Sequence, residues 1–310
     1  MSIVEKAIQK RRERLGKADV TLAEKEELAS NPERESVPTQ ADAKERSSQR
    51  EETQSRSTEL PRITIDVERL RQFGLVPPED YAERVANEYR SIKRPLLDKL
   101  GQAGDNKMPR ARLLNRLVVT SSVPGEGKTF TAINLAFSLA RERDYKVVLI
   151  DGDVLKPRAT EAFGLQDKRG FGDLLADESL SVESALFESD VDSLWVMPAG
   201  RRDPLLAEHL SSRRADQVLA HVARLRPAQI LVIDSPPLLP TAEAPLLAAR
   251  AGQVVMVIRA GATAQHTLRL ALGSLREDHE VSLLLNQTEL PRWQDYYSQY
   301  SGYYARSTSE

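Results

Sequence analysis

The chain has 310 residues, enough for one large α/β domain with additional tails. It contains no cysteine, which excludes disulfide bonds and thiolate metal sites. Its 44 basic and 46 acidic residues leave a net charge of -2, so no nucleic-acid partner is indicated. No apolar run approaches the roughly 18 residues of a membrane span and no hydrophobic signal segment opens the chain, so we expect a cytoplasmic protein.

Residues 1–60 are expected to add little to a folded core. Residues 21–60 are rich in Glu, Ser, Arg, Gln and Thr, a composition typical of a disordered linker. Residues 1–17 form a short basic amphipathic pattern that could contact a partner or an anionic membrane surface, and a frayed solvated helix is the open alternative. The apolar face of this pattern consists of Ile3, Val4, Ala7 and Ile8.

The folded domain is predicted at residues 61–292, and it should begin with two helices within residues 61–100. Asp66 can cap a first helix that ends at Gly74. Asp80 can start a second helix, and Pro95 should disturb it because proline lacks the N–H that an interior helical position donates.

A phosphate-binding loop is predicted between a buried strand within residues 113–119 and an amphipathic helix over residues 131–140. Gly125 and Gly127 allow backbone N–H groups to approach phosphate oxygens, Lys128 can reach the β- and γ-phosphates, and the Thr129 hydroxyl can ligate Mg²⁺. Ser122 replaces the first glycine of the pattern G-x-x-x-x-G-K-[ST], but the flanking strand and helix supply the required context. The predicted nucleotide-binding residues are Val123, Pro124, Gly125, Glu126, Gly127, Lys128, Thr129 and Phe130.

Beyond this loop, apolar runs alternate with helical patterns. Runs that are apolar on both faces fit a mainly parallel sheet with helices on each side, which predicts a three-layer α/β domain with its ligands at the carboxyl edge of the sheet. The further strands are predicted at residues 146–150, 193–197, 229–233, 253–258 and 281–285.

Three aspartates follow two of these strands at the edge where the phosphate loop lies. Asp153 and Asp234 suit Mg²⁺, which takes one or two carboxylates together with phosphate oxygens and water. Asp151 is placed to deprotonate an incoming hydroxyl group as a kinase base does. The alternative for each aspartate is a helix cap or a turn residue, which is common after a strand.

Residues 293–310 form a tyrosine-rich tail in which Ser, Gln and Gly separate the aromatic residues. The spacing fits neither a buried strand nor a helix face, so we expect a mobile segment that another active site could engage. A docking or stacking element is the open alternative. The candidate phosphorylation sites are Tyr296, Tyr297, Tyr300, Tyr303 and Tyr304.

These motifs together resemble the bacterial tyrosine kinases, a family with a P-loop NTPase fold. The similarity rests on residues 120–129, 150–153 and 233–237, which look like the Walker A, Walker A′ and Walker B motifs of that family, and on the tyrosine cluster. More narrowly, residues 1–7, 62–66, 89–97 and 127–136 are similar to the exosortase-associated tyrosine autokinases that accompany exopolysaccharide gene clusters.

The resemblance implies autophosphorylation of the tail tyrosines that depends on ATP and Mg²⁺, with one subunit presenting its tail to the next. It also implies a ring-like homo-oligomer, a membrane polysaccharide copolymerase as activator, and recruitment to the inner face of the cell membrane. Lys128 and Asp151 would be catalytic, Thr129, Asp153 and Asp234 would hold the metal, and Asn286 would lie near adenine.

The chain departs from the family in its oligomerisation helix, which usually reads E-x-x-R-x-x-[RK]. Arg90 and Lys93 match this pattern, but Asn87 occupies the glutamate position and Glu88 follows one residue later. Glu88, Arg90 and Lys93 are therefore the candidate oligomerisation residues. Two rival functions are a partitioning or division-site ATPase, whose signature lysine is replaced here by Val123, and a nucleotide-binding scaffold that transfers no phosphate.

Overall fold

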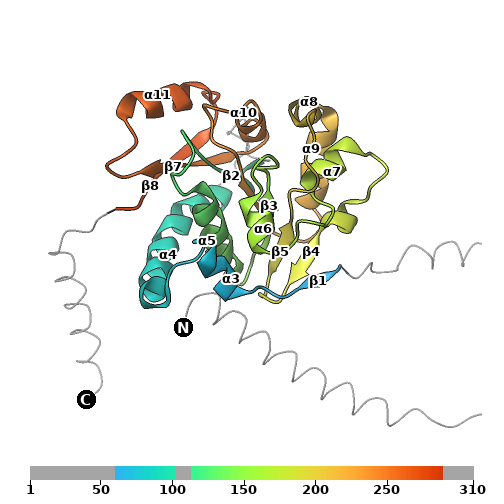
Figure 1. Ribbon diagram of the computed structural model, residues 1–310, viewed down its shortest axis with the longest axis horizontal. Coiled ribbons are helices and arrows are strands. Elements are labelled where there is room, and N and C mark those ends of the chain that lie inside the picture. Colours follow the sequence, from blue (N-terminus) through green and yellow to red (C-terminus); the bar gives the residue numbers. More distant parts are fainter. Residues whose placement is uncertain (1–59, 102–112, 289–310) are drawn as a thin grey trace, which may run out of the picture.

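The computed structural model of the chain describes residues 60–101 and 113–288 (Figure 1). The predicted N-terminal helix and linker and the predicted tyrosine-rich tail lie outside the described residues. Within them, an eight-stranded sheet has the order β1-β4-β5-β3-β6-β2-β7-β8. Neighbouring strands are parallel except for the antiparallel pair β4 and β5. The strands are Arg62–Ile63 (β1), Arg116–Ser121 (β2), Lys146–Asp151 (β3), Phe187–Ser189 (β4), Leu194–Met197 (β5), Gln229–Asp234 (β6), Gln253–Arg259 (β7) and Glu280–Asn286 (β8).

Helices cover both faces of this sheet, as the pattern of doubly apolar strands predicts. The helices are Val67–Gln72 (α3), Glu79–Gly101 (α4), Lys128–Ala140 (α5), Arg158–Ala162 (α6), Phe171–Ala176 (α7), Leu206–Ser211 (α8), Arg213–Val222 (α9), Glu243–Ala248 (α10) and Gln265–Gly273 (α11), with a 3₁₀ turn (η3) at Val182–Ala185.

Alternating residues of the central strands separate two large hydrophobic cores. Val147 and Leu149 of β3 pack with the apolar residues of α3, α4, α5 and α6. Val148 and Ile150 of the same strand belong to the opposite core, which α7, α8 and α9 cover (Figure 1). The predicted three-layer α/β fold is thus confirmed, and β2, β3 and β6 are buried along their length except at the first residue of β3.

The N-terminal helices differ from their prediction in one respect. Asp66 caps α3 as predicted, because its carboxylate accepts a hydrogen bond from the N–H of Arg69 at 3.0 Å. The expected disturbance at Pro95 is wrong, since α4 runs through it to Gly101. Tyr89 and Leu96, on either side of Pro95, are buried against the first core, and this packing offsets the loss of one helical hydrogen bond.

Two short strands were missed by the sequence analysis. Strand β1 has two residues and β4 has three, which is too short for a periodic pattern to be recognised. Both lie at one end of the sheet, where β4 pairs with β1 in parallel and with β5 in antiparallel orientation. Within the described residues, no helix has the length and apolarity that crossing a membrane would require.

Lys93, which the sequence assigns to an oligomer contact, points into the subunit. Its side chain is buried, and its Nζ donates to the carbonyl oxygen of Ser138 at 2.8 Å and pairs with Glu142 at 2.5 Å. The last carbonyl groups of a helix have no partner within the helix, and Ser138 belongs to the last turn of α5. Lys93 therefore caps α5 from α4, whereas Glu88 and Arg90 remain exposed.

Lys93→Met should lower the free energy of unfolding by about 1–3 kcal/mol, because it leaves the Ser138 carbonyl and Glu142 without their partner. The matched variant Arg90→Met removes an exposed cation from the same helix and should change stability by less than about 0.5 kcal/mol. Urea denaturation followed by circular dichroism measures both values. Equal effects of the two variants would contradict the assignment of Lys93 to the interior.

Candidate functional site

The loop between β2 and α5 has the backbone geometry of a phosphate cradle. Gly125 and Gly127 have φ angles of +88° and +96°, a region that residues with a Cβ rarely adopt. A Cβ on Gly127 would also lie 2.0 Å from the Nδ2 atom of Asn286. The loop leads directly into the N-terminus of α5 at Lys128, where unpaired N–H groups favour an anion.

Two side chains hold this loop in shape. Glu126 is buried, and its carboxylate accepts a hydrogen bond from the N–H of Val123 at 3.0 Å and another from the hydroxyl group of Thr263. Asn286, the last residue of β8, donates from Nδ2 to the carbonyl oxygen of Glu126 at 2.9 Å. Asn286 therefore has a contact with the loop itself, and its predicted position near adenine stays a prediction.

Strand register brings the aspartates together at the carboxyl edge of the sheet. Asp151 at the end of β3 is the direct neighbour of Asp234 at the end of β6. In-register residues of adjacent parallel strands lie about 5 Å apart, with side chains on the same face. Gly152 keeps this pair close, because its N–H donates to the carbonyl oxygen of Asp234 at 2.7 Å and a Cβ there would lie 2.8 Å from that oxygen.

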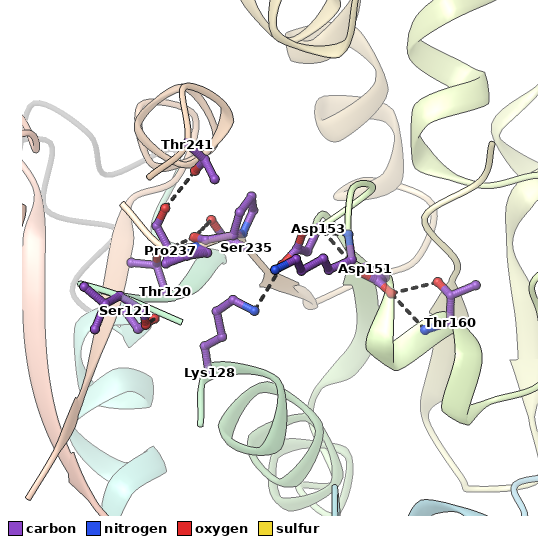
Figure 2. A network of polar contacts seen from close by, with 12 residues as sticks. Thr120, Ser121, Lys128, Asp151, Asp153, Thr160, Ser235, Pro237 and Thr241 are labelled. Atoms are coloured by element: carbon purple, nitrogen blue, oxygen red, sulfur yellow. Dashed lines mark hydrogen bonds and ion pairs between the residues drawn. The ribbon is translucent and has the colours of Figure 1, made fainter. Parts of the chain in front are cut away.

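Lys128 extends from the start of α5 toward these carboxylates (Figure 2). Its Nζ lies 3.1 Å from Oδ2 of Asp153. Burial by itself lowers the pKa of Lys128, but the charges of Asp234, Asp153 and Asp151 outweigh it and raise the pKa above its ordinary value. Lys128 is thus held as a cation where the phosphate loop meets the acidic groups.

Asp234 has the properties expected of a metal ligand. The residue is fully buried, and neither of its carboxylate oxygens has a hydrogen bond of good geometry among the described residues, although the Thr129 hydroxyl group and the charge of Lys128 both lower its pKa. Burial raises its pKa to about 6 against the opposing charge of Lys128. A buried carboxylate without partners is costly, and a cation would supply the missing interaction.

The residues present fit Mg²⁺ bound together with a nucleotide. The described residues contain no group of three or more Asp, Glu or His side chains that could hold a metal ion unaided. Mg²⁺ requires fewer protein ligands when phosphate oxygens and water complete its shell. Asp153, Asp234 and the buried Thr129 offer oxygen atoms of the required kind.

Asp151 lies farther from the loop and is firmly held. Its Oδ2 accepts hydrogen bonds from the N–H and the hydroxyl group of Thr160 at 2.8 and 2.7 Å. Its Oδ1 accepts one from the N–H of Asp153 at 3.2 Å. Burial, and next the neighbouring charge of Asp234, raise the pKa of Asp151 to about 8.

A cavity of about 750 Å³ opens over the loop and is the right size for a nucleotide. Asp153 lines this cavity, whereas Asp151 and Asp234 are buried behind its wall. Two cationic side chains also line it: Lys156, from the loop after β3, and Arg158, the first residue of α6. The other residues of the wall include Gly74, Leu75, Pro236, Pro237, Pro240 and Thr241.

Several residues of the cavity wall and of the contacts around Asp151 were missed by the sequence analysis. Thr160 lies inside α6 without any motif around it, and Gly74 and Leu75 precede the phosphate loop by about fifty positions. Only the strand-end aspartates and the glycine-containing loop carried a local signal. The described residues bring all three aspartates, Lys128 and Thr129 together, while the five candidate tyrosines lie outside them.

In metal-free buffer, the free energy of unfolding of the wild type should fall between about pH 5 and about pH 8. It should fall more steeply there than the free energy of unfolding of Asp151→Asn. The folded protein keeps a proton on Asp151 up to a pKa of about 8, whereas the unfolded chain loses it near 3.8. Between these values the folded state binds more protons, so raising the pH weakens it by at most roughly 1.4 kcal/mol per pH unit. The asparagine side chain does not titrate, so its own contribution to the free energy of unfolding does not change with pH.

Urea denaturation in the presence of a metal chelator, at a series of pH values, measures the difference between the two proteins. Parallel stability curves for wild type and Asp151→Asn would show that the Asp151 carboxyl group does not hold its proton in the folded state.

Comparison with known sequences places this chain in a family. The profile of the CobQ/CobB/MinD/ParA nucleotide-binding domain matches residues 117–282, more than half of the chain. The tyrosine-protein kinase YwqD of Bacillus subtilis is 33% identical over 195 residues, which cover 62% of this chain and 78% of YwqD. The tyrosine-protein kinase wzc of Salmonella typhimurium is 26% identical over 193 residues, and these make up only 25% of that longer protein.

Solved structures agree with this relation. The BceF tyrosine kinase domain is 26% identical, with a TM-score of 0.54 over 80% of this chain and 90% of that chain. The VpsO kinase domain is 29% identical, with a TM-score of 0.51 over 65% of this chain and all of that chain. The chain belongs to the CobQ/CobB/MinD/ParA family of nucleotide-binding domains and, within it, to the bacterial tyrosine-protein kinases.

Proposed function

We propose that this protein transfers the γ-phosphoryl group of ATP to the C-terminal tyrosines of a neighbouring subunit. The observation that carries the proposal is the row of Lys128, Asp153 and Asp151 beside the fully buried, unpartnered carboxylate of Asp234. This arrangement adjoins a nucleotide-sized cavity at the N-terminus of α5. A phosphate cradle, a metal-binding carboxylate and a candidate base are the parts that phosphoryl transfer requires.

The phosphate end of the nucleotide would be bound by the loop and by Lys128. The N–H groups of residues 125–130 would contact the β- and γ-phosphates, and the Lys128 ammonium group would stabilise the charge that develops on the transferred group. Thr129, Asp153 and Asp234 would hold Mg²⁺, which would neutralise part of the charge of the phosphate groups.

Asp151 would act as the general base once the acceptor hydroxyl group reaches it past the cavity wall, which Asp151 itself does not line. The tyrosine oxygen forms a bond to the γ-phosphorus as the bond from that phosphorus to the β,γ-bridging oxygen breaks. ADP leaves, and the phenolic proton passes to the Asp151 carboxylate. A base works best when its pKa lies near the working pH, and the raised pKa of Asp151, about 8, fits this role. Asp153, which lines the cavity and pairs with Lys128, suits the metal side of the site.

The wider setting of the reaction is part of the same proposal. The similarity of residues 1–7, 62–66 and 89–97 to exosortase-associated autokinases supports a role in exopolysaccharide synthesis and export. A ring-like homo-oligomer, activation by a membrane polysaccharide copolymerase and a place at the inner face of the cell membrane follow from that similarity. The exposed Glu88 and Arg90 of α4 are the candidate oligomer contacts.

Lys128→Met should abolish phosphotyrosine formation, because methionine cannot neutralise the γ-phosphate charge and because it breaks the ion pair with Asp153. We expect a loss of at least about a hundredfold in rate. Immunoblotting for phosphotyrosine after incubation of the purified full-length protein with Mg²⁺-ATP and its activator measures this change. If the wild-type protein released free phosphate from ATP while no phosphotyrosine appeared on it, the protein would instead be a regulatory ATPase.

Replacing Tyr296, Tyr297, Tyr300, Tyr303 and Tyr304 together by Phe should remove the phosphotyrosine signal while leaving nucleotide affinity unchanged. The change deletes five hydroxyl groups and none of the described residues that line the cavity. Phosphotyrosine detection combined with titration of a fluorescent ADP analogue separates the two effects. An undiminished signal in the Phe variant would place the phosphorylation site elsewhere in the chain.

A further inference from the structure

Thr160 contacts Asp151 more extensively than any motif residue does. It is the third residue of α6, it is buried, and both its N–H and its hydroxyl group donate to the same carboxylate oxygen, Oδ2. The distances are 2.8 and 2.7 Å, within the usual range of well-formed hydrogen bonds (Figure 2).

A third hydrogen bond fixes the direction of the Thr160 hydroxyl group. The N–H of Ala199 donates to Oγ1 of Thr160 at 2.8 Å. A backbone N–H can only donate, so Oγ1 must accept this bond and its own hydrogen is left to point at Asp151. The hydroxyl group therefore stays a donor to Oδ2.

Several hydrogen bonds hold the segment around Ala199, which follows the end of β5. The carbonyl oxygen of Ala199 accepts a hydrogen bond from the N–H of Gly172 at 2.8 Å. The buried Asp173 accepts from the N–H of Gly170 at 3.0 Å and from Nε of Arg201 at 2.8 Å. These hydrogen bonds hold the segment around Ala199 in place. The Ala199 amide therefore holds the Thr160 hydroxyl group, which in turn holds the Asp151 carboxylate.

This arrangement distinguishes the two oxygens of Asp151. Oδ2 receives two donors from Thr160, whereas Oδ1 receives one longer bond, from the N–H of Asp153 at 3.2 Å. Oδ1 is left with the greater capacity to accept a further proton. The neighbouring Asp234 repels Asp151, so a carboxylate without these donors would turn away from the shared edge of the sheet.

We propose that Thr160 is a positioning residue for phosphoryl transfer, which holds the Asp151 carboxylate so that Oδ1 receives the proton of the acceptor tyrosine. The inference rests on the proposed function, since it assumes that Asp151 acts in catalysis. Thr160 touches neither nucleotide nor acceptor in this scheme and works entirely through Asp151.

Thr160→Val and Thr160→Ser test the role in the full-length protein, with Asp151→Asn as comparator. Valine keeps the size and branching of threonine but has no hydroxyl group, so the turnover rate of tail phosphorylation should fall by about 10- to 100-fold, as expected for a misplaced catalytic group. The KM for ATP should stay within about twofold, because the phosphate loop is untouched. Serine restores the hydroxyl group and should recover most of the rate.

The outcomes separate this inference from the proposed function. A normal rate in Thr160→Val beside an inactive Asp151→Asn would overturn the positioning role alone, as would a Thr160→Ser variant as slow as the valine variant. A normal rate in Asp151→Asn would overturn the base role of Asp151 and with it the positioning role of Thr160, while the kinase activity itself would stand. A wild type that transfers no phosphate would overturn the proposed function and this inference with it. In an active protein, a crystal structure of Thr160→Val with an unmoved Asp151 carboxylate would overturn the positioning role alone, and a reoriented carboxylate would support it.

Discussion

The site depends on the parallel register of β3 and β6, which places Asp151 and Asp234 side by side in the interior. Two carboxylates at this spacing repel one another, and burial removes the water that would screen them. The folded protein tolerates the pair because Lys128 supplies a positive charge and Thr160 supplies two donors. Asp234 is left without a hydrogen bond of good geometry, and this buried carboxylate prepares the edge of the sheet for a further cation.

The rest of the domain supports that arrangement from several directions. The loop that follows α3 forms one wall of the cavity, and the carbonyl oxygen of Leu75 accepts a hydrogen bond from Nδ2 of Asn134 in α5 at 2.9 Å. Lys93 of α4 binds the opposite end of α5 through the Ser138 carbonyl. The helix that begins at Lys128 is therefore held in its middle and at its C-terminal end by segments that precede it in the chain.

Much of the fold was predictable because its strands are long and apolar on both faces. The five later strands and the strand before the phosphate loop were each found to within a few residues, since each contains a run of consecutive apolar residues that leaves a clear pattern. Asp66 was recognised as a cap by its side chain and position. Pro95 misled the prediction because local propensity ignores the packing of Tyr89 and Leu96, and β4 was invisible because three residues carry no period.

The sequence by itself determined which chemical groups the site would have, because the glycines and lysine of the loop and the strand-end aspartates are local signals of phosphate and metal binding. It also sufficed to identify the family. Tertiary structure alone decided how those groups are oriented: that Asp151 is held by Thr160, that Asn286 braces the loop at Glu126, and that Lys93 turns inward. These contacts join residues on different elements, and their partners are set by strand register and helix packing, which no short stretch of sequence encodes.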